Sequence, residues 1–189
     1  DCAGNTNTWS YIINIERNDF TLPANGSATV TCPAAANVVP TPPSKMSQCG
    51  EPIIPTGPVV SATPTCEGTK TYTWTYTDCE GNSHDWIFTY TIERNPFTVP
   101  ANGAATVACP SGITIPTPPI VTSNCGESIT PTGPTVVNSP DPLLGDGTRT
   151  YTWTYVDCEG NTAQWSFTFT VNDAVAPTVT CPAATATID

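Results

Sequence analysis

An internal repeat of 77 to 79 residues constrains this chain more than any other feature. Residues 72–82 read Tyr-Thr-Trp-Thr-Tyr-Thr-Asp-Cys-Glu-Gly-Asn, and residues 151–161 repeat them with one change, Val156 in place of Thr77. Pro-Ala-Asn-Gly occurs at 23–26 and again at 100–103, and the same period separates Trp9, Trp86 and Trp165. Because self-similarity at a fixed spacing marks one structural unit used several times, the chain is predicted to contain copies of a small domain.

Within the repeats, apolar and polar residues alternate with a period of two, which is typical of half-buried β-strands. One predicted strand has threonines on one face and, on the other, Tyr72, Trp74 and Tyr76. A turn at residues 79–82 leads to a second strand with Trp86, Phe88, Tyr90 and Ile92 on one face. The matching residues of the second copy are Tyr151, Trp153, Tyr155, Trp165, Phe167, Phe169 and Val171. We therefore expect an all-β fold of tandem immunoglobulin-like β-sandwich repeats with disulfides, each core being filled by this hairpin.

The repeat period divides the chain into four parts. Residues 17–93 and 94–172 are predicted to be two full repeats. Residues 1–16 match the last strand of a preceding repeat, and residues 173–189 match the first strand of a following one. A lone strand cannot bury a core, so we expect other repeats, in this chain or in neighbouring chains, to complete these ends. Further strands of the first repeat are expected at residues 20–32, 38–43 and 53–60.

The charge balance excludes several classes of partner. The chain has 16 acidic and five basic residues, and its net charge is -11. Five scattered cations cannot form the basic patch that nucleic acid requires. No apolar stretch approaches the ~20 residues of a membrane-spanning helix, so direct membrane insertion is not expected. The 21 prolines and abundant threonines favour strands and proline-rich loops over helices.

Nine cysteines without a Cys-x-x-Cys pair indicate disulfides and hence an extracellular or cell-surface location. Alternating strand directions would place Cys49 and Cys79 at one end of the first repeat, and Cys32 and Cys66 at the other. The predicted bridges are therefore Cys49–Cys79, Cys32–Cys66 and, in the second repeat, Cys125–Cys158. We expect Cys109 to be a buried free thiol, and Cys2 and Cys181 to have partners outside this stretch of chain.

Oxygen-bearing side chains gather at the predicted turn of each repeat and form a candidate calcium site. Calcium binds six to eight oxygen ligands. The candidate ligands are Glu51, Asp78, Glu80 and Asn82 in the first repeat, and Glu127, Asp157, Glu159 and Asn161 in the second. The alternative is a tight turn in which Asp and Asn bond to the local backbone, and the absence of an EF-hand-like run favours it. No other cofactor is indicated.

No catalytic residue is predicted. His84 is the only histidine, and Ala163 occupies its place in the second copy, so Ser-His-Asp and Cys-His arrangements have no support. The four hairpin tryptophans offer a sugar-stacking platform, but their alternation with threonine favours a place in the core. The threonine face is expected to be ordinary strand surface, with lateral contact between subunits as the main alternative.

Several of these motifs resemble hyalin-repeat (HYR) and HYR-like modules. They are Thr41-Pro-Pro with Cys49-Gly, the segment 72–82, and Ala176-Pro-Thr-Val-Thr-Cys-Pro182, and the resemblance covers nearly the whole chain. In particular, the motifs are similar to those of arrays in very large surface proteins of Bacteroidota, which include adhesins exported by type IX secretion. The resemblance implies an immunoglobulin-like fold, a role in adhesion or extension, and no catalytic residues. Many HYR modules carry cysteine where Trp86 and Trp165 stand, so their disulfide pattern is not carried over.

We therefore expect a structural stalk or filament module of a bacterial adhesin or extracellular fibre, with neighbouring repeats as its partners. Two alternatives stay open. The repeats themselves bind a surface glycan or a protein, or the chain is the subunit of a self-assembling filament.

Overall fold

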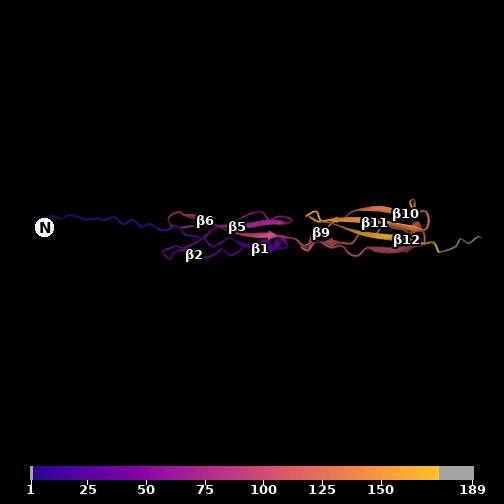
Figure 1. The fold of residues 1–189 in the computed structure, drawn as a ribbon, viewed down its shortest axis with the longest axis horizontal. Coiled ribbons are helices and arrows are strands. Elements are labelled where there is room, and N and C mark those ends of the chain that lie inside the picture. The colour runs from indigo at the N-terminus through magenta and orange to yellow at the C-terminus, as the bar shows by residue number, and fades with distance from the viewer. Residues whose placement is uncertain (1, 175–189) are drawn as a thin grey trace, which may run out of the picture. The chain divides into compact units, whose positions relative to one another are not determined.

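The computed structural model describes residues 2–174, and the chain divides into two compact units, Asp1–Glu93 and Arg94–Asp189 (Figure 1). We refer to the repeats in these units as repeat 1 and repeat 2. Strands dominate both units, and the helices in the described part of the chain are two short 3-10 helices, η1 (Pro33–Asn37) and η2 (Pro110–Gly112). The predicted fold of two all-β, sandwich-like repeats with disulfides is confirmed.

Repeat 1 is built on a four-stranded sheet with the order β1-β6-β5-β4. The strands are β1 (Gly26–Val30), β4 (Thr56–Val60), β5 (Gly68–Thr77) and β6 (Ser83–Ile92). A second, two-stranded sheet pairs β2 (Lys45–Met46) with β3 (Pro52–Ile53). β1 runs parallel to β6, and the other neighbours in the main sheet are antiparallel.

Repeat 2 has the same topology. Its main sheet has the order β10-β11-β12-β7, and its small sheet pairs β8 with β9. The strands are β7 (Gly103–Val107), β8 (Val121–Thr122), β9 (Ser128–Ile129), β10 (Thr132–Ser139), β11 (Gly147–Val156) and β12 (Thr162–Val171).

The predicted aromatic hairpin forms the centre of each repeat. In repeat 1, β5 and β6 pair over ten residues, and Trp74 lies opposite Trp86 with ring centroids 5.5 Å apart. In repeat 2, Trp153 lies opposite Trp165 at 5.4 Å. All four indoles are buried, each with 4–7% of its surface exposed. The tryptophans therefore belong to the core, as predicted, and do not form a sugar-binding platform.

The strand predicted at residues 38–43 is wrong, because this segment does not join a sheet. Prolines at 40, 42 and 43 lack the N–H groups that a strand ladder needs. The tyrosines of the hairpin bind the carbonyls of this region instead. Tyr72 donates its hydroxyl to Ala36 O at 2.8 Å, and Tyr90 donates to Val38 O at 3.1 Å. In repeat 2, Tyr155 likewise donates to Pro119 O at 2.7 Å.

The other two predicted strands of repeat 1 are shorter than expected. The entering strand begins only at Gly26, and the third is divided into β3 and β4. The pairing of β4 with β5 shifts register between Thr56 and Val59, around the cis peptide Gly57–Pro58. Prolines within this stretch explain the interruption.

The terminal segments differ from the repeats. Residues 2–16 form no strand, and their large apolar side chains are exposed; Trp9 has 84% of its surface exposed and Ile12 has 90%. That they complete another repeat stays a prediction. The strand predicted at 173–189 lies outside the described residues from 175 onward, as does Cys181.

Candidate functional site

The turn between β5 and β6 holds most of the predicted site residues of repeat 1. Asp78 Oδ1 accepts the backbone N–H groups of Glu80 at 3.0 Å and Asn82 at 2.9 Å, and its Oδ2 accepts the Asn82 side-chain amide at 2.9 Å. Gly81 has φ +90°, a backbone conformation that favours glycine. The hydrogen bond from the Asn82 side chain, together with those from the backbone, lowers the pKa of Asp78.

The turn between β11 and β12 repeats this arrangement. Asp157 accepts the N–H groups of Glu159 at 3.0 Å and Asn161 at 2.8 Å, and the Asn161 amide at 2.9 Å. Burial pushes the pKa of Asp157 upward, but the hydrogen bonds from Asn161, Glu159 and Gly160 outweigh it, so the pKa is lowered. Both aspartates therefore act chiefly as acceptors that close their own turns.

An arginine holds acidic residues of the site together in repeat 2. The Arg94 side chain is 3% exposed; it forms an ion pair with Glu127, and its Nε lies 3.3 Å from Glu159. The hydrogen bond to Glu127 raises the pKa of Arg94 and lowers the pKa of Glu127. Repeat 1 has a looser counterpart, in which Arg17 Nε lies 3.9 Å from Glu80. Sequence reasoning missed these arginines as site residues, although Glu-Arg recurs at 16–17 and 93–94.

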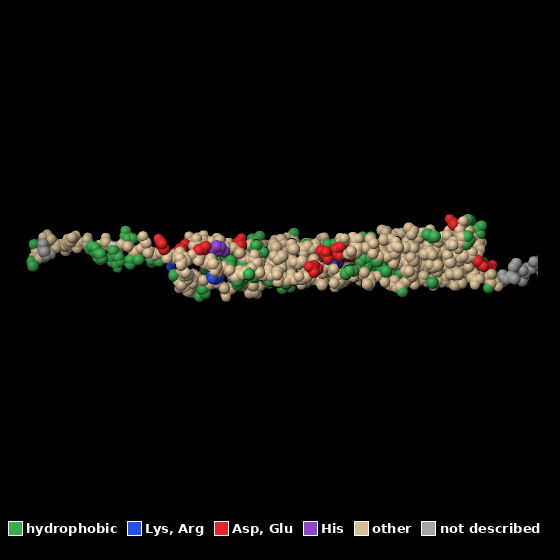
Figure 2. Space-filling model, viewed as in Figure 1, with side chains coloured by type: hydrophobic (Ala, Val, Ile, Leu, Met, Phe, Trp, Pro, Cys, Tyr) green, Lys and Arg blue, Asp and Glu red, His purple; other side chains and the backbone are tan. Residues whose placement is uncertain are grey.

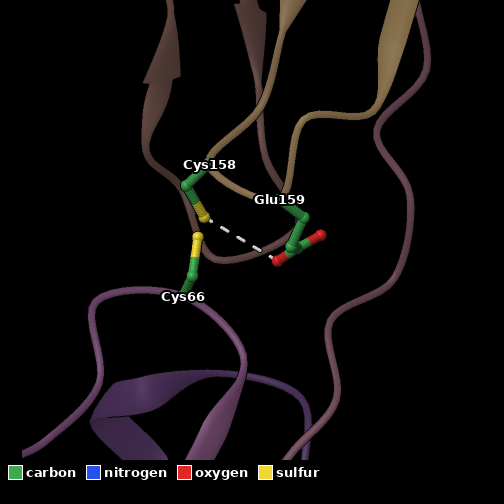
Figure 3. A group of neighbouring side chains, drawn as sticks. All are labelled: Cys66, Cys158 and Glu159. Carbon is green, nitrogen blue, oxygen red and sulfur yellow. Dashed lines mark hydrogen bonds between the residues drawn. The ribbon is translucent and has the colours of Figure 1, made fainter.

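These contacts bear on the candidate metal ligands. Asp78 and Asp157 are occupied by their own turns, and Glu127 and Glu159 by Arg94. The Cys158 sulfur lies 3.7 Å from Glu159 Oε1 (Figure 3). Cys158 and Cys66, which Figure 3 also labels, are both in disulfides, so neither supplies the thiolate that a metal requires. Both interpretations of the eight residues, a calcium site and a turn closed by its own hydrogen bonds, stay predictions.

The disulfides differ in part from those predicted. Two disulfides use Cys32, Cys66, Cys125 and Cys158. Cys49 and Cys79 are free and exposed, so the predicted Cys49–Cys79 bridge is not formed. The pairings Cys32–Cys66 and Cys125–Cys158 stay predictions. Cys109 is a free thiol as expected, but it is exposed instead of buried, because the chain around it runs over the surface after β7.

A pocket of about 430 Å³ lies beside Cys79 in repeat 1. Its lining includes Arg17, Ser47, Glu51, Ile53, Asp78 and Cys79. Arg17 donates a hydrogen bond from Nη1 to the Cys79 sulfur. On the face shown in Figure 2, acidic side chains form a few small groups and basic side chains are scarce. The pocket therefore combines one cation, acidic groups and a free thiol.

Taken together, the paired sheets, the buried aromatic hairpins and the disulfides define a class of small, repeated, disulfide-bearing β-domain. The family model described as an HYR-like domain with four cysteines matches residues 20–92 and 97–171 of the sequence. The chain therefore belongs to this family. Such domains are extracellular, adhesion-type repeats. No curated protein matches the chain. None of the helices in the described residues has the length and apolarity needed to cross a membrane.

Repeat 1 has the four cysteines of the family name, at 32, 49, 66 and 79. Repeat 2 has three, at 109, 125 and 158. The counterpart of Cys66 is missing from the loop that joins β10 to β11, which also differs in length and sequence.

Proposed function

We propose that the chain is a non-enzymatic structural module of a surface adhesin or extracellular fibre, in which each repeat serves as a spacer. The observation that carries the proposal is the way in which each repeat uses its chemically versatile side chains internally. The tryptophans are buried, the tyrosine hydroxyls bind loop carbonyls, and the turn aspartates bind their own backbone. Residues committed in this way stabilise a domain and are not available for turnover of a substrate.

The resemblance to the adhesin arrays of Bacteroidota supports a bacterial, cell-surface setting for this module. Its partners in that setting are neighbouring repeats, and no bound cofactor is needed for the role. The two copies of one fold within 189 residues are the arrangement by which such proteins gain length.

Two measurements test the proposal. A glycan array probed with the oxidised 189-residue chain is expected to give no signal above that of an unrelated β-sandwich protein. Specific, saturable binding to one glycan class would replace the spacer by an adhesive module. Electron microscopy of the chain with its free thiols alkylated is expected to show discrete particles, whereas filaments would favour a self-assembling subunit.

A further inference from the structure

Each repeat carries cysteines at two ends, which the strand register distinguishes. The turn end of a repeat is the end with the hairpin turn, which contains Cys79 in repeat 1 and Cys158 in repeat 2. Cys49 lies in the loop whose Ser47 and Glu51 line one pocket with Cys79, and Cys125 lies in the loop whose Glu127 shares Arg94 with Glu159. The far end lies where the last strand finishes. Cys32 follows β1 just beyond Val30, which pairs with Ile92, and Cys66 precedes Gly68, which pairs with the same residue. In repeat 2, Cys109 follows Val107, which pairs with Val171.

A ten-residue strand separates the two ends by roughly 30 Å, so a turn-end cysteine cannot reach a far-end cysteine of its own repeat. Any bond between the two kinds of end must therefore join different repeats. Within the described residues of the two repeats, one end of each kind has free thiols. They are the turn end of repeat 1, with Cys49 and Cys79, and the far end of repeat 2, with Cys109.

The bonding state of the turn end does not follow from its local structure. The loop around Cys49 is closed by Ser47, whose Oγ accepts Glu51 N at 3.1 Å, and Ser123 does the same for Glu127 at 3.2 Å. The hairpin turns of the two repeats share their aspartate-centred hydrogen bonds. Yet Cys125 and Cys158 are in disulfides, and Cys49 and Cys79 are not. The bonding state therefore does not follow from the turn hydrogen bonds, which the two repeats share.

The surroundings of Cys79 suit a site of disulfide exchange. Cys79 is exposed and accepts a hydrogen bond from the Arg17 guanidinium, so a second sulfur can approach it from solvent. The adjoining pocket of about 430 Å³ gives an incoming chain segment room beside the sulfur. The side chains of Glu51 and Ser47, which also line the pocket, offer that segment polar contacts.

We propose that the turn end of repeat 1 is a covalent docking site, at which Cys49 and Cys79 form disulfides with far-end cysteines of another HYR-like repeat. Among the described residues of the two repeats, the free far-end cysteine is Cys109, so a second copy of the chain is the partner available for a test. The union is head to tail, because the two ends are different surfaces. It deepens the spacer role proposed above by making the joint between successive repeats covalent.

The bond forms by thiol–disulfide exchange with an oxidised dithiol carrier or glutathione disulfide. The Cys79 thiolate attacks the oxidant's disulfide, which releases one thiolate and leaves a mixed disulfide on Cys79. The Cys109 thiolate of the partner then attacks the Cys79 sulfur of that mixed disulfide, forms the protein disulfide and releases the second thiolate. Two cysteine thiols are thereby oxidised, and the oxidant is reduced to two thiols.

The test mixes unlabelled and 15N-labelled chains with glutathione disulfide and maps cross-linked peptides by mass spectrometry under non-reducing conditions. The expected products join Cys49 or Cys79 of one copy to Cys109 of the other. C109S and the C49S/C79S double variant are each expected to lose nearly all of this covalent product. The matched control C2S, which removes another exposed free thiol, is expected to keep it.

Three outcomes overturn the proposal: a Cys49–Cys79 bridge within one chain, cross-links that survive C49S/C79S, and cysteines 49 and 79 that remain reduced when Cys109 of a second copy is offered. None of them bears on the glycan array or on the electron microscopy of the alkylated chain, so failure here leaves the spacer proposal standing. Circular dichroism of each variant verifies that the fold is retained.

Discussion

Gly26 is held against the aromatic face of β6, and its place shows why Pro-Ala-Asn-Gly recurs in this chain. The Trp86 indole N–H donates to Ala24 O at 3.0 Å, and the Asn25 side chain accepts Ile87 N at 2.9 Å. A Cβ on Gly26 would lie 2.4 Å from Phe88 Cδ2, closer than carbon atoms approach without displacement. Repeat 2 keeps all three contacts, through Ala101, Asn102 and Gly103. The motif therefore fixes the start of β1 on the core by two hydrogen bonds and one close approach.

Replacement of this glycine tests that interpretation. Gly26→Ala is expected to lower the free energy of unfolding by about 1–3 kcal/mol, because the added methyl group forces the Phe88 ring to move. Gly103→Ala should cost a similar amount, since its Cβ would lie 2.3 Å from Phe167 Cδ2. Gly145→Ala is the matched control, with no atom within 4 Å of its added Cβ. Chemical denaturation measures all three, and equal stability of the Gly26 and Gly145 variants would contradict the argument.

The hairpins and their turns were predictable because the residues that define them lie close together in the sequence. Alternation of rings with threonine defines the buried face of β5, and the Asp-Cys-Glu-Gly-Asn turn closes it. The proline-rich segment was not predictable in the same way. Its extended chain resembles a strand in sequence, yet its carbonyls are bound by tyrosine hydroxyls from residues 33 to 52 positions away. The burial of Arg94 against Glu127 depends on equally distant chain and had only the recurring Glu-Arg as a signal.

The turn aspartates make the stability of the folded chain depend on pH. The pKa values of Asp78 and Asp157 are lowered in the folded chain, so the native state binds fewer protons than the unfolded state near these values. Their stabilisation is present above the ordinary carboxyl pKa of about 4 and is lost as the pH falls through the folded pKa. Asp78→Asn with Asp157→Asn is expected to lower the melting temperature at neutral pH. The difference from the original chain should shrink as the pH falls below about 4; a constant difference would exclude this linkage.

The same turns bear on calcium. Each Asp78 oxygen already accepts at least one hydrogen bond from the turn, and a cation would have to displace these donors. We therefore expect the melting temperature to be the same in millimolar calcium and in a chelator. A calcium-dependent rise that disappears in Asp78→Asn would instead identify the turn as a ligand set.

The described residues form two separate hydrophobic cores. One is formed by residues of repeat 1, with Tyr72, Trp74 and Tyr76 at its centre, and the other by residues of repeat 2, with Tyr151, Trp153 and Tyr155. None of the residues that build one core appears in the other. Apolar burial is the main favourable term in folding, so the free energy that holds each repeat together comes from within that repeat.

Because the two cores share no residue, a core substitution is predicted to unfold only the repeat that carries it. Trp74→Ala removes a side chain that is 4% exposed, and such truncations cost about 3–5 kcal/mol, enough to unfold a marginally stable repeat. Hydrogen exchange read by mass spectrometry is expected to show lost protection in peptides from residues 20–92 and native protection in those from 97–171. Trp153→Ala, whose side chain is equally buried, should give the reverse pattern. Loss of protection in both repeats from either variant would contradict this prediction and would mean that the two repeats unfold as one cooperative unit.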